Sequence, residues 1–161
     1  MNILYISDSY TSLTVYASQV HALCNEHAKY NHVTLLVLSN YSDFKNANFQ
    51  DAIYKFKKLL GFKVIAPAMN CIVARFAASK FKDLFMAADI IHCRGHIGAA
   101  FALNVLKYLK MSRPIVADIR GAIVDEFANN PSIKSRLLAR YADETEKYVF
   151  DNVKSIFFVS E

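Results

Sequence analysis

Three polar clusters in this sequence contain residue types that could bind an anionic or hydroxyl-rich ligand. Arginine offers a rigid fork of N–H donors that suits phosphates and hydroxyls, and glycine lets the backbone approach a ligand closely. Serine, threonine and tyrosine add hydroxyl donors and acceptors. The clusters are Arg94-Gly95-His96, Arg120-Gly121 with Glu126 after it, and the run Ser9, Tyr10, Thr11 and Ser12.

The elements around the first two clusters predict that they lie side by side. Short apolar runs, Ile90-Ile91 and 115–117, come just before the clusters, and apolar residues recur at helical spacing over 99–109. A strand, helix and strand of this kind closes as a right-handed parallel crossover. Both polar ends then emerge at the carboxyl edge of the sheet, where open α/β folds bind ligands. Asp118 is expected beside Arg94 at that edge.

The same alternation of apolar runs and helical patterns extends along the whole chain. We predict an α/β fold, a doubly wound, Rossmann-like parallel sheet of about six strands with helices on both faces, in a single domain over 1–161. Helices are expected over 49–60, over 71–86 and from Pro131 to about Asp151. The expected strands are marked by Ile3, Val33, Val64, Ile90, Ile115 and Ile156. Because the last strand is followed only by Ser160-Glu161, we expect another domain to follow it.

Composition excludes several classes of protein. Hydrophobic residues make up 54% of the 161 and charged residues only 20%, which excludes intrinsic disorder. The net charge of +5 favours anionic partners. The sequence has no polybasic tail, so nucleic acid is not favoured as a partner. Three cysteines and the lack of a secretory leader or of about 18 consecutive apolar residues predict a cytoplasmic protein.

Two further patterns have simpler alternatives. His21, Cys24 and His27 recur every three residues before His32, but this spacing drifts around a helix, so we interpret them as surface and core-edge residues and expect no metal. The hydroxyls at 9–12 fit two interpretations equally, a phosphate site at a helix start or simple helix capping.

The span from Tyr54 to Lys82 contains seven lysines and arginines, no acid and several interleaved aromatic residues. One interpretation is peripheral contact with an anionic membrane. The simpler alternative is an ordinary solvated helix surface, on which lysine stems lie over apolar side chains.

Several segments, taken in order, resemble the amino-terminal domain of GT-B glycosyltransferases of family 4. They are the opening Asn2–Ser7, the helix 16–27 leading into 32–36, Ala88–His92, Arg120-Gly121, Glu146 in the long helix, and the closing 156–160. The resemblance covers essentially the whole chain, and it depends on the order and spacing of motifs that are weak alone. It implies the acceptor-binding half of a two-domain enzyme. The other half, which binds most of the nucleotide-sugar donor, would be a further domain.

The resemblance also implies transfer of a sugar to a glycan or lipid-linked acceptor, with no metal or resident cofactor. Two positions depart from the family pattern: 9–12 replaces a Gly-Gly loop, and Arg120-Gly121 replaces His-Gly. Arginine cannot act as a general base at neutral pH, but it can stabilise charge on a departing diphosphate. This suits a retaining transfer assisted by the leaving phosphate, although the residues themselves leave the stereochemistry open. Glu146 is expected to hold a loop through hydrogen bonds rather than to take part in the chemistry.

A stand-alone flavodoxin-like module that binds a nucleotide or flavin, or that signals, is the alternative. The hydroxyl-rich run after the first strand is the feature that favours it. A signalling receiver would need clustered acids there, and only Asp8 is present. A flavin module would need aromatic residues at the later carboxyl-edge turns, and the Arg94 and Arg120 clusters have none.

Overall fold

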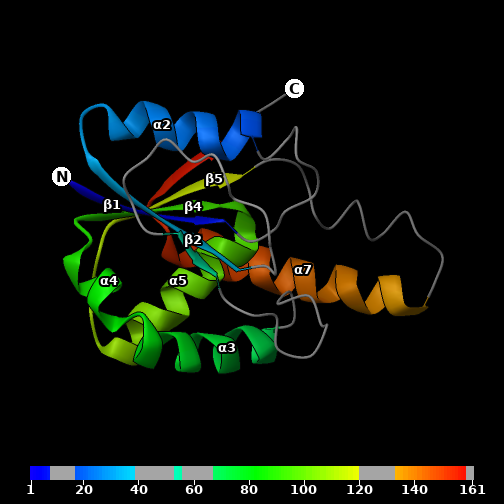
Figure 1. Ribbon diagram of the computed structural model, residues 1–161. Helices are drawn as coiled ribbons and strands as arrows, with labels where there is room; N and C mark the ends of the chain where they lie inside the picture. Colours follow the sequence, from blue (N-terminus) through cyan, green and yellow to red (C-terminus); the bar gives the residue numbers. More distant parts are fainter. Residues whose placement is uncertain (8–16, 39–52, 56–66, 120–132, 159–161) are drawn as a thin grey trace.

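The structure, a computed structural model, describes residues 1–7, 17–38, 53–55, 67–119 and 133–158. Six parallel strands form one sheet in the order β3-β2-β1-β4-β5-β6 (Figure 1). The predicted fold class is therefore confirmed. The strands are β1 Asn2–Ser7, β2 His32–Val37, β3 Ile53–Lys55, β4 Ile90–Arg94, β5 Ile115–Ile119 and β6 Ser155–Phe158.

Helices cover both faces of the sheet. Figure 1 shows α2 over one face and α3, α4, α5 and α7 over the other. A short π-helix, η1, runs directly into α2. The helices are η1 Ala17–His21, α2 Ala22–Ala28, α3 Pro67–Lys80, α4 Lys82–Ala87, α5 Gly95–Leu109 and α7 Ile133–Asn152.

Alternation along β1 explains why its central residues, Ile3 to Ile6, are apolar at every position. Leu4 and Ile6 belong to the larger core under α3, α4 and α5, whereas Ile3 and Tyr5 belong to the smaller core under α2. A parallel strand buried on both faces needs apolar side chains at successive positions. Residues at the ends of β1 and its neighbouring strands therefore face either α2 or the helices on the other side, according to their place in this alternation.

The strand order places the ligand-binding edge. The order 3-2-1-4-5-6 is that of Rossmann folds, and the chain changes direction across the sheet between β1 and β4. Flavodoxin-like proteins have the order 2-1-3-4-5, so the topology differs from that of the flavodoxin-like alternative. Open sheets of this kind bind ligands beyond the carboxyl ends of the strands at the switch point, here the ends of β1 and β4.

The predicted helix over 49–60 is wrong at its centre, because Ile53–Lys55 forms the edge strand β3. This strand pairs with Leu35–Val37 of β2, so pairing at the sheet edge overrides the local helical pattern. The rest of that predicted helix, and the strand expected around Val64, lie outside the described residues.

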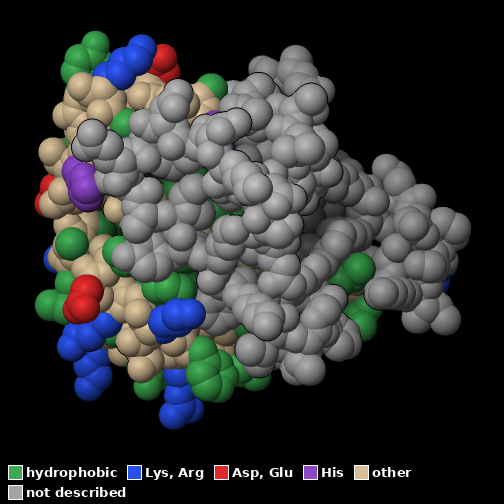
Figure 2. Space-filling view, viewed as in Figure 1, with side chains coloured by type: hydrophobic (Ala, Val, Ile, Leu, Met, Phe, Trp, Pro, Cys, Tyr) green, Lys and Arg blue, Asp and Glu red, His purple; other side chains and the backbone are tan. Residues whose placement is uncertain are grey.

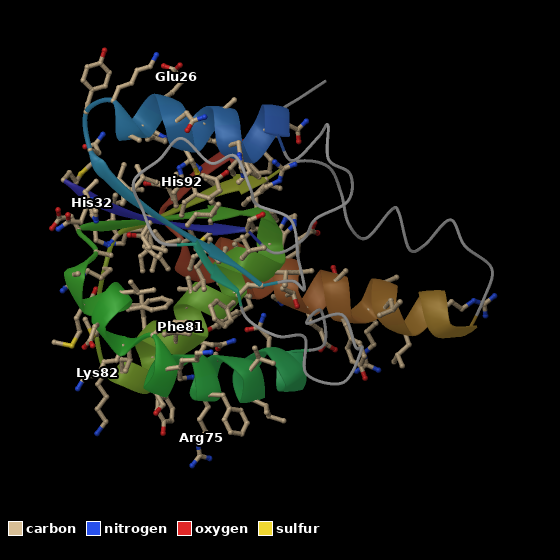
Figure 3. All side chains as sticks on the ribbon, in the orientation of Figure 1. Glu26, His32, Arg75, Phe81, Lys82 and His92 are labelled. Atoms are coloured by element: carbon tan, nitrogen blue, oxygen red, sulfur yellow. The ribbon has the colours of Figure 1, made fainter. Side chains whose placement is uncertain are left out.

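The predicted helix over 71–86 is divided at Phe81. Phe81 has φ −116° and ψ 19°, which is not helical, and its ring is buried in the larger core. The chain therefore breaks into α3 and α4 where this ring turns inward (Figure 3). The long helix is confirmed as α7, which ends at Asn152; its expected start at Asn129–Pro131 is outside the described part.

Candidate functional site

Three polar residues lie in one row across the carboxyl edge of the sheet. Ser7 at the end of β1 is the register partner of Arg94 at the end of β4, and Arg94 is in turn the partner of Asp118 on β5. Ser7 and Asp118 are buried, and Arg94 is half-buried. Residues at matched register positions of a parallel sheet face the same side, so the row points to one face.

That face is the one covered by η1 and α2. Tyr5, two residues before Ser7, lies in the smaller core, and the amide oxygen of Gln19 in η1 accepts a hydrogen bond from Nη2 of Arg94. The Nη1 group of Arg94 is buried and has no hydrogen-bond partner among the described residues. We call Ser7, Gln19, Arg94 and Asp118 the switch-point cluster. π-Helical turns such as η1 occur frequently at functional sites.

Aromatic packing holds α2 over the sheet beside this cluster. The ring centroid of His92 lies 4.7 Å from that of Tyr5 and 5.8 Å from that of His27 on α2. Figure 3 shows His92 between α2 and the strands. Since η1 is continuous with α2, these contacts also fix the place of Gln19.

Gly95 makes the turn from β4 into α5. Its φ of 76° is in the left-handed region, which glycine adopts readily. The first turn of α5 packs closely on β1, because a Cβ on Gly98 would lie 3.4 Å from the carbonyl oxygen of Ile6. Together these glycines place the amino end of α5 against the end of β1, and helix amino ends favour anions.

His96 lies on the other side of the sheet from Arg94. Its imidazole is 1% exposed, with Nε2 3.2 Å from a carboxylate oxygen of Glu146 and its ring 5.7 Å from that of Phe150, both on α7. Burial lowers the pKa of His96 to about 4, so the ring is neutral at pH 7. The side chain joins α5 to α7. Glu146 thus lies against α5, and its expected hydrogen bonds to a loop remain a prediction.

Of the predicted site residues, the structure describes Arg94, Gly95 and His96. It brings Arg94 and Gly95 to the switch point, with Asp118 beside Arg94 as expected. It places the His96 side chain within the α5–α7 contact. The remaining predicted site residues, Ser9, Tyr10, Thr11, Ser12, Arg120, Gly121 and Glu126, lie outside the described residues.

Of the residues in the predicted histidine and cysteine pattern, Cys24 and His27 lie on α2, whereas His21 ends η1 and His32 begins β2. Cys24 is fully buried, and burial raises the pKa of its thiol to about 12, which disfavours the thiolate that binds metals. Within the described ranges, no group of three or more His, Cys, Asp or Glu side chains is arranged to hold a metal ion. No helix among them is long and apolar enough to cross a membrane.

Sequence reasoning missed Gln19 and Ser7 as members of this cluster. Ser7 had a usable signal, because it ends the first strand just as Arg94 ends the fourth. Gln19 had none, since its role depends on where α2 lies.

No protein-family model matches this chain, and no curated protein does. Among solved structures, it is similar to the lipopolysaccharide outer core galactosyltransferase WaaB in its apo form, with a TM-score of 0.61 and 12% identity over 98% of this chain and 44% of that one. It is also similar to a putative UDP-N-acetylglucosamine 2-epimerase from Listeria monocytogenes, with a TM-score of 0.52 and 11% identity over 97% of this chain and 43% of that one.

The chain therefore spans less than half the length of each of these two proteins. At 11–12% identity the likeness concerns the fold. The chain has the Rossmann-like fold of the part of each protein that it matches.

Proposed function

We propose that this chain is the acceptor-binding part of a glycosyltransferase that moves a sugar from a nucleotide-sugar to a glycan or lipid-linked acceptor, with retention. The observation that carries the proposal is the place of Arg94. Its half-buried guanidinium lies at the switch point, where it donates to Gln19 and has its Nη1 group unpaired among the described residues. The fold is shared with a galactosyltransferase, which supports this reaction class.

In this proposal Arg94 and Gly95 bind acceptor hydroxyls or phosphate, and Gln19 holds the Arg94 guanidinium in place. Ser9, Tyr10, Thr11, Ser12, Gly121 and Glu126 complete the binding site, His96 supports it by packing α5 on α7, and Arg120 stabilises charge on the departing diphosphate. The nucleotide-sugar binds mainly to a second domain, and no metal or resident cofactor takes part. Alignment of donor with acceptor supplies about 7–11 kcal/mol of the barrier, so both parts are needed.

Calorimetric titration of the chain with a panel of oligosaccharide acceptors and with uridine and guanosine diphosphate-sugars tests this proposal. We expect at least one saccharide to bind and the nucleotide-sugars to bind weakly at millimolar concentration. Arg94→Ala should weaken saccharide binding by about tenfold or more, the value of a hydrogen bond from a charged group. The matched control is Arg75→Ala, an exposed arginine on α3. Tight binding of a nucleotide or flavin without saccharide binding would refute the proposal.

We also propose peripheral contact with the inner, anionic face of a membrane, which fits a cytoplasmic enzyme acting on a lipid-linked acceptor. The outward stripe of α3 carries Ile72 and Phe76, 47% and 60% exposed, beside the exposed Arg75 and Lys80. Figure 2 shows lysine and arginine side chains along this side of the molecule, and Figure 3 shows Arg75 pointing away from it. Exposed apolar side chains between cations suit insertion among anionic headgroups.

A further inference from the structure

A pocket of about 470 Å³ lies at the opposite edge of the sheet from the switch-point cluster. It is formed by the second half of α5, the segment leading into β5, and the turn from α7 to β6. We call it the basal pocket. Its volume is within the range of about 300–1,000 Å³ that small-molecule sites occupy.

The wall of the basal pocket is apolar in part, because six of the eleven residues that line it have apolar side chains. Side chains from three separate segments contribute to it, so the pocket is part of the packed fold. Leu106, Ile115 and Val153 are buried members of the larger core, and Leu103 and Met111 pack against that core. An apolar wall of this kind favours an aliphatic chain, because each methylene removed from water gains about 0.8 kcal/mol, or roughly fourfold in affinity.

Two cations, and no acid, line the same pocket. They are Arg113, which is half-buried, and Lys154, which is exposed. The Arg113 guanidinium donates to two backbone carbonyls, that of Met86 at 3.0 Å and that of Ser112 at 3.1 Å. Neither cation has an ion-pair partner in the described part of the chain. A positive charge held partly out of water beside an apolar wall attracts an anion.

The helix dipoles oppose an anion here but are too small to decide the outcome. Both α5 and α7 end at this edge, and a helix carboxyl end carries about half a negative charge. At α5 the carbonyls of Leu106 and Lys107 already accept hydrogen bonds from Met111 and Lys110. Two full positive charges therefore exceed two partial negative ones.

We propose that the basal pocket binds a single-chain anionic amphiphile, an aliphatic chain with one carboxylate or phosphate head. The chain lies along Leu103, Leu106 and Val153, and the head lies between Arg113 and Lys154. The pocket holds about sixteen liquid-water volumes, which accommodates a chain of about ten carbons with its head. This site is separate from the switch-point cluster and does not depend on the function proposed for that cluster.

Calorimetric titration of the chain with hexanoate, octanoate and decanoate below their micellar concentrations tests the proposal. We expect saturable one-site binding that tightens up to about fourfold per methylene. Decyl phosphate should bind comparably, whereas inorganic phosphate and decan-1-ol should bind at least tenfold more weakly than decanoate. Equal binding of decanol and decanoate, or no saturable binding of decanoate at millimolar concentration, would overturn the proposal.

Variants locate the site. Leu103→Trp should fill the pocket and abolish decanoate binding, and Lys154→Ala should weaken binding about threefold, because Lys154 is exposed. Arg113→Gln should weaken it about tenfold. Arg136→Ala, an exposed cation on α7 outside the pocket, is the charge-matched control and should leave binding unchanged. If Arg113→Gln does not fold because its bond to Met86 is lost, Leu103→Trp and Lys154→Ala still test whether decanoate binds in the basal pocket. Unchanged decanoate binding in both variants would refute this location of the site.

Discussion

Replacing His96 by Gln should remove a specific pH dependence of stability. His96 is enclosed between α5 and α7, and burial lowers its pKa to about 4, compared with 6.5 for an exposed histidine. In the unfolded chain the ring takes up a proton below pH 6.5, but in the folded chain it does not until about pH 4. Between these values the unfolded state binds one more proton, so the fold loses stability as the pH falls.

The size of the effect follows from that shift. Each pH unit in this window changes the free energy of unfolding by up to about 1.4 kcal/mol, which gives about 3 kcal/mol over the whole window. The carboxylate of Glu146, 3.2 Å from Nε2, stabilises the protonated ring and reduces this figure. Even so, 2 kcal/mol would be a large part of the roughly 5–15 kcal/mol by which domains are stable.

Chemical denaturation of both proteins from pH 4.5 to 8 measures the effect. The wild type should lose stability below pH 6.5 more steeply than His96→Gln, and the two curves should run parallel above it. Burial also lowers the pKa of His21, so a slope of the same sign remains in the variant. Parallel curves over the full range would refute the reasoning. So would an NMR titration of the ring protons that gives His96 a pKa of 6.5 or above.

Four other outcomes are expected. Gly95→Ala should cost about 1–2 kcal/mol in unfolding free energy, because alanine is strained at φ 76°; an unchanged denaturation midpoint would contradict this. In the complete enzyme Arg120→Ala should lower turnover tenfold or more, and wild-type turnover in the folded variant would remove it from the site. Arg75→Ala combined with Phe76→Ser should weaken salt-sensitive binding to anionic vesicles, by about 1 kcal/mol for the charge alone, whereas Tyr30→Ser in the turn after α2 should not; equal binding to neutral vesicles would exclude the electrostatic contribution. The isolated chain should unfold cooperatively in calorimetry yet transfer no sugar, and turnover by this chain alone would overturn the half-enzyme proposal.

The fold could be predicted because its main signals are local. Buried parallel strands such as β1 and β2 are short apolar runs, and α5 and α7 repeat apolar residues with helical period. β3 could not be found in this way. Three residues, Ile53–Lys55, are too short to show a period, and their extended conformation depends on pairing with β2, which is distant in sequence.

The candidate site was predictable only where strand ends determine it. Arg94 and Asp118 each come at or near the end of an apolar run, so parallel pairing brings them together, and Ser7 follows by the same rule. The contact between Gln19 and Arg94 could not be foreseen. It depends on how α2 packs over Tyr5 and His92, which is a property of the assembled core.

The separation of Arg94 from His96 shows how much one residue of register decides. β4 ends at Arg94 and α5 begins at Gly95, so Arg94 keeps the alternation of the strand and faces η1. His96 is already helical, and each helical residue turns the chain by about 100°. Its ring therefore points to α7 on the opposite side of the sheet. Two polar residues that flank one glycine thus take different places: Arg94 lies at the switch point against Gln19, while His96 joins α5 to α7.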